Sequence, residues 1–246
     1  MMINYLVLPF GKMAYYLEGE GQTIVFLHGW GQNFSSFKKI VSNLISEYQV
    51  LGVDLLGFGH SEVPTTPLSV KEYADSLKAL FDTLMINSPI IVAHSFGGRI
   101  ALKYCADYGA EKLFLLGAAG LKKRSIRRFF QIWYYKIFRK IYKIIAPKKY
   151  QKLIDKSGSK DYRSAKGIMR QILIKTVNYD SRRDMKRVAC PTYLFWGLLD
   201  EETPYGDGLK MAKIIPNAEI VTFYNSGHFC YIQEEQRFIK MLKDLL

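Results

Sequence analysis

The stretch from Ile90 to Gly98 limits the folds open to this chain more than any other part of the sequence. An apolar, β-branched run ends at Ser95, small residues flank the serine, and a helical pattern begins directly after it. A serine on such a sharp strand-to-helix turn is held in strained backbone geometry that exposes its hydroxyl. The spacing is G-x-S-x-G with Ala93 in the first position. The stretch therefore predicts a strand, a turn with a candidate nucleophile, and a helix, although small turns of this composition also arise by chance.

Short β-branched runs alternate with helical patterns along the 246 residues, which is typical of a mainly parallel α/β sheet in one domain. We expect eight strands, at Tyr5–Leu8, Met13–Leu17, Thr23–Leu27, Gln49–Val53, Ile90–Ala93, Leu113–Leu116, Tyr193–Trp196 and Glu219–Phe223. We expect helices at Phe34–Ser46, Val70–Met85, Gly98–Asp107, Tyr205–Ile214 and Glu234–Leu245. This order predicts an α/β fold with a doubly wound eight-stranded sheet.

The alternation stops over residues 121–187, which contain no strand-like run. This segment holds 22 lysines and arginines against four acidic residues, whereas the rest of the chain has 13 basic and 18 acidic residues. Its first part, Arg124 to Lys149, is amphipathic at helical spacing. We therefore expect a basic helical cap inserted at 121–187 into an α/β core formed by 1–120 and 188–246.

The residues after the last two strands supply the partners that a reactive serine needs. A serine hydroxyl needs a base at neutral pH, and that base needs an orienting carboxylate. Asp200 follows the seventh expected strand and His228 the eighth, which is the order that this kind of turn predicts. Because strands of an open parallel sheet end at one edge, Ser95, Asp200 and His228 should converge there. Glu201 and Glu202 are alternative acids.

The loop His28–Gly31, directly after the third expected strand, fits an oxyanion-binding role. Gly29 and Gly31 let the backbone approach a substrate, and the N–H of Trp30 can face a developing negative charge. The N–H of Phe96, at the start of the helix after Ser95, would be the other donor. His28 is a candidate for lining the substrate pocket.

The remaining histidines and one further aspartate have structural interpretations. His94 adjoins Ser95 but points to the other side of its strand, so we expect it to support the site rather than to react. His60 lies in a glycine-containing loop that begins with Asp54. We expect both residues to fix this loop, because Asp54 precedes the serine in the chain and so does not fit the position of the acid.

Five motifs at these spacings together resemble the α/β-hydrolase superfamily: His28–Gly31, Asp54–Ser61, His94–Gly98, Trp196–Asp200 and Gly227–His228. The resemblance covers the chain except the basic segment and extends in part to pimeloyl-[acyl-carrier protein] methyl ester esterases. It implies that Ser95 is the nucleophile, Asp200 the acid and His228 the base. It also implies that Trp30 and Phe96 are the oxyanion donors and that the insertion is a cap. Members with an aspartate nucleophile differ at the turn, where this chain has serine.

The expected activity is that of a serine hydrolase, a carboxylesterase on small or medium apolar acyl groups, working through an acyl-enzyme. Thioesters, lactones, amides and carbon–carbon bonds remain open as substrates. The aromatic side chains of the insertion predict an apolar pocket, with candidates Phe130, Trp133, Tyr134 and Phe138. A non-catalytic receptor of the same fold is the alternative from another functional class.

The basic charge of the insertion has three interpretations. In the first, its lysines and arginines form a solvated surface above an apolar side that covers the site. In the second, they attract the segment to an anionic membrane. In the third, they dock an acidic carrier protein that delivers the substrate. Nucleic acid is not expected as a partner, because no recognition module accompanies the charge.

Composition adds a few expectations about context. The N-terminus lacks the pattern of a signal peptide, and no apolar run reaches the length of a membrane span. Cys105, Cys190 and Cys230 are an odd number without metal-ligand spacing, so we expect three buried thiols in a reducing cytoplasm. We expect no metal and no cofactor, and the sequence does not define the oligomeric state.

Overall fold

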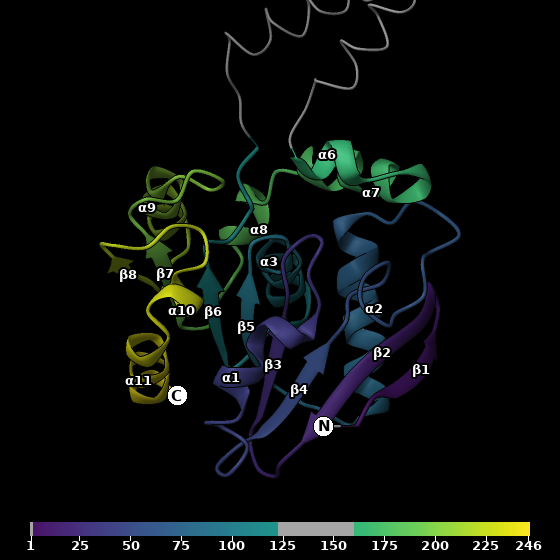
Figure 1. Cartoon of the computed structure of the whole chain (residues 1–246), viewed down its shortest axis with the longest axis horizontal. Helices are drawn as coiled ribbons and strands as arrows, with labels where there is room; N and C mark the ends of the chain where they lie inside the picture. Colours follow the sequence, from purple (N-terminus) through teal and green to yellow (C-terminus); the bar gives the residue numbers. More distant parts are fainter. Residues whose placement is uncertain (1, 123–159) are drawn as a thin grey trace, which may run out of the picture.

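The computed structural model describes residues 2–122 and 160–246, which form one eight-stranded sheet in the order β1-β2-β4-β3-β5-β6-β7-β8 (Figure 1). The pairs β1–β2 and β2–β4 are antiparallel, and every other neighbouring pair is parallel. The strands are β1 (Asn4–Leu8), β2 (Gly11–Glu18), β3 (Thr23–Leu27), β4 (Gln49–Val53), β5 (Ile90–His94), β6 (Lys112–Leu116), β7 (Thr192–Gly197) and β8 (Ala218–Phe223). The predicted mainly parallel eight-stranded sheet is confirmed.

Helices cover both faces of this sheet. They are the 3-10 helix η1 (Phe34–Phe37) and the α-helices α1 (Lys38–Val41), α2 (Val70–Thr83), α3 (Phe96–Tyr108), α6 (Lys160–Ser164), α7 (Gly167–Val177), α8 (Arg182–Met185), α9 (Tyr205–Ile214), α10 (Cys230–Gln233) and α11 (Glu235–Leu245). Side chains alternate across each strand. Val25 and Leu27 therefore join the core under α2, α3, α8 and α9. Ile24 and Phe26 join the opposite core under η1, α1, α10 and α11.

One expected helix is wrong in its type and extent. The helix expected at Phe34–Ser46 is a 3-10 turn followed by one turn of α-helix that ends at Val41. Phe34, Phe37 and Ile40 are buried at a spacing of three residues, which both helix types satisfy, so periodicity alone did not separate them. The helix expected at Glu234–Leu245 is present as α11, which begins one residue later, and the separate short helix α10 precedes it.

The end of the basic segment adds α6 and α7 at the edge where the parallel strands end (Figure 1). Arg99 of α3 ties α7 to the core, because its buried guanidinium donates to the carbonyls of Thr176 and Tyr179 at 2.5 and 2.6 Å. Burial lowers the pKa of this guanidinium to about 10. The expected helix Arg124–Lys149 lies outside the described residues, and so do the pocket candidates Phe130, Trp133, Tyr134 and Phe138.

Two expectations from composition can be compared with the structure. Cys105, Cys190 and Cys230 are free and buried, as predicted. Within residues 2–122 and 160–246, no helix has the length and apolar character needed to cross a membrane.

Candidate active site

Ser95 lies at the turn between β5 and α3, at the edge of the sheet where the parallel strands end. Its backbone has φ 48° and ψ −109°, a strained conformation for a residue with a side chain. Backbone hydrogen bonds hold this turn in place. The N–H of Ser95 donates to the carbonyl of Leu116 at 3.0 Å. Its carbonyl accepts from the N–H groups of Gly98 and Ala119 at 3.1 and 2.9 Å. The neighbouring strand β6 thus keeps the serine in this geometry.

Gly97 allows α3 to start directly against the end of β3. A Cβ atom on Gly97 would lie 2.5 Å from the carbonyl oxygen of Leu27 and 2.7 Å from that of His28. The Gly97 N–H donates to the His28 carbonyl at 3.1 Å. This close approach explains why small residues follow the serine. It also brings the loop after β3 beside the N-terminus of α3, where helix N–H groups lack intrahelical partners.

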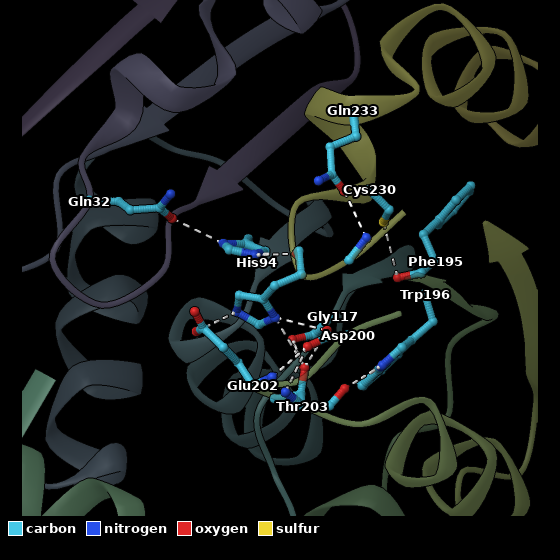
Figure 2. Close-up of polar contacts among 12 residues, drawn as sticks. Gln32, His94, Gly117, Phe195, Trp196, Asp200, Glu202, Thr203, Cys230 and Gln233 are labelled. Carbon is cyan, nitrogen blue, oxygen red and sulfur yellow. Dashed lines mark hydrogen bonds and ion pairs between the residues drawn. The ribbon is translucent and has the colours of Figure 1, made fainter. Parts of the chain in front are cut away.

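Asp200 and His228 form a buried pair, although 28 positions separate them in the chain. Oδ2 of Asp200 lies 2.8 Å from Nδ1 of His228, and both side chains are almost fully buried (Figure 2). Asp200 follows β7 and His228 follows β8, so adjacent parallel strands deliver the two residues to one edge. This contact leaves Nε2 as the ring nitrogen available for proton transfer.

Three further donors fix the Asp200 carboxylate. Oδ1 accepts the N–H groups of Glu202 and Thr203 at 2.9 and 2.8 Å, and Oδ2 accepts the Thr203 hydroxyl at 2.8 Å. The Thr203 hydroxyl also lies 2.9 Å from the carbonyl of Gly117. Sequence reasoning missed Thr203. Its position three residues after the acid, directly before Pro204, could have indicated that Thr203 donates to Asp200.

Glu202 contacts the opposite side of the His228 ring. Its Oε2 lies 3.4 Å from Nε2, while its side chain remains 65% exposed. Asp200, in contrast, is on Nδ1 and buried, so the two carboxylates hold different positions on one imidazole. Among the described residues, no hydrogen bond joins Nε2 of His228 to the hydroxyl of Ser95. Such bonds are often long before a substrate is bound.

The loop after β3 packs against the start of α3. The N–H of Gln32 donates to the Gly29 carbonyl at 3.2 Å and closes a turn around Trp30. The Trp30 ring meets those of Phe58 and Phe96 with centroids 4.8 and 5.3 Å apart. The two residues expected as oxyanion donors, Trp30 and Phe96, are therefore in contact through their side chains.

His28 lies inside this loop instead of lining an open pocket. It is fully buried, its Nε2 accepts the N–H of Leu55 at 3.0 Å, and its Nδ1 lies 2.7 Å from the Gly29 carbonyl. Burial lowers the pKa of His28 to about 4, opposed by the bond to Gly29. A neutral ring that donates from Nδ1 and accepts at Nε2 satisfies both contacts, so His28 joins the loop to the segment after β4.

His94, the last residue of β5, lies between the two loops. Its Nδ1 is 3.0 Å from Oε1 of Gln32, and its Nε2 is 3.1 Å from the carbonyl oxygen of His228 (Figure 2). Sequence reasoning placed His94 in a supporting role but did not identify Gln32, which is 62 positions away. The glycine-flanked loop gave no indication of that contact.

Asp54 and His60 fix the loop after β4, as expected. Oδ1 of Asp54 accepts the N–H of Phe34 at 2.8 Å, and Oδ2 accepts the N–H of His60 at 2.9 Å. Asp54 is fully buried, and no hydrogen bond or ion pair among the described residues joins it to His228. Asp54 therefore holds the chain between β4 and α2.

Comparisons with known proteins agree with this fold. The model of the α/β hydrolase fold family matches residues 22–141. The AB hydrolase superfamily protein YisY of Bacillus subtilis is 27% identical, with 91% of each chain covered. The pimeloyl-[acyl-carrier protein] methyl ester esterase of Chromobacterium violaceum is 26% identical over 93% of this chain and 95% of that protein. The structure of the esterase EaEST from Exiguobacterium antarcticum superposes with a TM-score of 0.79 over 99% of each chain, at 22% identity.

The fold and the comparisons lead to one conclusion. The sheet has the strand order and parallel pairing described above, and the family match includes the turn at Ser95. The match with YisY extends over nearly the whole chain. This chain therefore has the α/β-hydrolase fold, and its sequence is similar to members of that superfamily over nearly its whole length.

Proposed function

We propose that this protein is a serine hydrolase that cleaves carboxylic esters through Ser95, His228 and Asp200. The observation that carries the proposal is the 2.8 Å contact between Oδ2 of Asp200 and Nδ1 of His228, at the edge of the sheet that also carries a serine in strained backbone geometry. A buried carboxylate on Nδ1 fixes the ring and stabilises the imidazolium that forms when Nε2 takes a proton. The serine turn supplies the nucleophile at the same edge of the sheet.

In the first half of the reaction, the Ser95 hydroxyl oxygen bonds to the acyl carbon while its proton passes to Nε2 of His228. The negative charge that develops on the carbonyl oxygen is held by the N–H groups of Trp30 and Phe96. The bond from the acyl carbon to the leaving oxygen then breaks. His228 returns the proton to that oxygen, so an alcohol departs and an acyl-Ser95 ester remains.

In the second half, water replaces the alcohol. His228 removes a proton from water, and the resulting hydroxide adds to the acyl carbon of the acyl-enzyme. The same two N–H groups stabilise the second tetrahedral intermediate. Its collapse breaks the bond to Ser95, and His228 returns the proton to the serine oxygen, which releases a carboxylic acid and restores the enzyme.

Hydrolysis of p-nitrophenyl esters tests this proposal. The wild-type protein should hydrolyse the acetate and butyrate esters, and Ser95→Ala and His228→Ala should each lower kcat by roughly 10⁴-fold with unchanged folding. A chain-length series from acetate to palmitate would define the acyl pocket, for which we propose small or medium apolar acyl groups. Full activity in Ser95→Ala would remove the mechanism.

A carrier-bound ester is the second candidate substrate. Two observations favour it: the similarity to a pimeloyl-[acyl-carrier protein] methyl ester esterase, and the 22 basic against four acidic residues of 121–187, which we propose as a cap over the site. Acidic carrier proteins would dock on such a surface. This candidate predicts faster turnover of a carrier-bound methyl ester than of the free methyl ester, with the difference lost at high salt. Equal turnover of both would exclude it.

The two other candidates have direct tests. An anionic membrane surface would bind the basic segment, and sedimentation with phosphatidylglycerol vesicles but not with phosphatidylcholine vesicles would support it. A non-catalytic receptor of this fold would leave all the p-nitrophenyl esters intact. The three buried free cysteines fit a reducing compartment, and we propose the cytoplasm.

A further inference from the structure

His94 is enclosed by the parts of the site that must keep a fixed geometry. It ends β5 directly before Ser95 and is 1% exposed. Its ring centroid lies 4.7 Å from that of His228, 5.1 Å from that of Phe229 and 5.0 Å from that of Tyr231. The ring therefore packs against the loop that carries His228 and against α10 behind it.

The other side of the His94 ring contacts the turn around Trp30. Oε1 of Gln32 accepts the Gly29 N–H at 3.0 Å and lies 3.0 Å from Nδ1 of His94. A Cβ atom on Gly29 would lie 2.7 Å from Oε1 of Gln32 and 2.8 Å from Nδ1 of His94. This position therefore admits only glycine as long as both side chains stay in place. The imidazole and the Gln32 amide thus fill the space between the turn and β5.

The two nitrogens of the His94 ring face two oxygens. Only an imidazolium could donate to both, and burial, with the nearby His228 as a lesser cause, holds the pKa of His94 well below its ordinary value. The neutral ring has one N–H. Oε1 of Gln32 already accepts the Gly29 N–H, whereas among the described residues the His228 carbonyl accepts a hydrogen bond from His94 alone. The proton therefore belongs on Nε2, because a buried carbonyl without a donor is costly.

We propose that His94 is a positioning residue, which holds the loop of His228 against the turn around Trp30 by donating from Nε2 to the His228 carbonyl. The inference rests on the proposed function, since it concerns the distance between the base and the oxyanion donors beside Ser95. His94 does not touch the reacting atoms. Its loss should displace His228 and so lower kcat, because displacements of about 1 Å can cost up to about 100-fold in rate.

Three substitutions separate the hydrogen bond from ring packing. A glutamine at this position can place its amide nitrogen near Nε2, an asparagine can place its amide near Nδ1, and a phenylalanine keeps only the ring. We expect His94→Phe and His94→Asn to lower kcat for p-nitrophenyl acetate by roughly 10- to 100-fold, with KM within about threefold of wild type. We expect His94→Gln to stay within about fivefold of the wild-type kcat. His60→Phe, on an exposed ring outside this contact, is the matched control and should stay within about twofold.

Circular dichroism and the rate of Ser95 labelling by a fluorophosphonate complete the experiment. Labelling should fall in parallel with kcat, because both depend on His228. If His94→Phe does not fold, the comparison of His94→Gln with His94→Asn decides. Equal losses in these two variants, or a folded His94→Phe with kcat close to wild type, would overturn the inference and leave the proposed function intact. A wild-type protein that is neither labelled nor active would instead remove the proposed function, and this inference with it.

Discussion

The strain at Ser95 predicts an effect on stability that is opposite to the usual effect of glycine. With φ 48° and ψ −109°, Ser95 occupies a conformation that costs a residue with a Cβ about 1–3 kcal/mol. Alanine keeps the Cβ and therefore the strain. Glycine removes it but loses about 0.5–1 kcal/mol more conformational entropy on folding. The balance favours Ser95→Gly over Ser95→Ala by about 1 kcal/mol in the free energy of unfolding.

Urea and thermal unfolding of the two variants measure this difference. In a chain of this size, about 1 kcal/mol corresponds to about 2–4 °C in Tm, with Ser95→Gly the more stable protein. Ser76, inside α2, provides the matched pair in ordinary helical geometry. There, glycine should be less stable than alanine by about 1 kcal/mol. If Ser95→Gly unfolds at or below the midpoint of Ser95→Ala, the turn is not strained and the reasoning fails.

Three further predictions concern charge and burial. Asp200→Asn should lower kcat by about 10⁴-fold, whereas Glu202→Gln should retain activity within about tenfold of wild type. The reason is that only Asp200 is buried on Nδ1 of His228. Equal losses of kcat in the two variants, measured by steady-state kinetics, would contradict this difference in role. Arg99→Met should lower the free energy of unfolding by about 2–4 kcal/mol, because it removes two hydrogen bonds from a buried guanidinium to the carbonyls of Thr176 and Tyr179. Arg182→Met, which removes a partly exposed ion pair, should cost less than about 1 kcal/mol. Similar urea midpoints for both variants would refute the anchoring role of Arg99. The free energy of unfolding should fall as the pH is lowered from about 6.5 to about 4, by up to about 1.4 kcal/mol per pH unit from His28, because the unfolded imidazole binds a proton in this range and the folded one does not. His28→Gln should make urea unfolding less dependent on pH, and an unchanged slope would contradict the assignment.

The sheet could be predicted from the sequence because its signals are local. Each strand is a short apolar run bounded by turn residues, and Ser95, Asp200 and His228 each follow such a run. The Asp200–His228 contact then follows from parallel pairing of β7 and β8. The turn at Phe34–Phe37 could not be separated from an α-helix, because burial every three residues fits both structures.

The supporting contacts could not be predicted, because they join residues that are distant in the chain. Gln32 meets His94 across 62 positions, and Arg99 meets Thr176 across 77. Neither side chain belongs to a periodic pattern or a spaced motif. His28, in contrast, does belong to a motif, but the motif indicated another role. Its place beside two glycines indicated a pocket, whereas its two hydrogen bonds place it inside the loop.

Peptide mapping by mass spectrometry after treatment with a fluorophosphonate shows whether Ser95 is the nucleophile. The reagent bonds covalently to a serine whose proton a neighbouring base can remove. We expect a single adduct on the peptide that contains Ser95. It should be absent from Ser95→Ala and should form far more slowly in His228→Ala. A wild-type protein without an adduct at Ser95, or one that is modified equally at other serines, would contradict it.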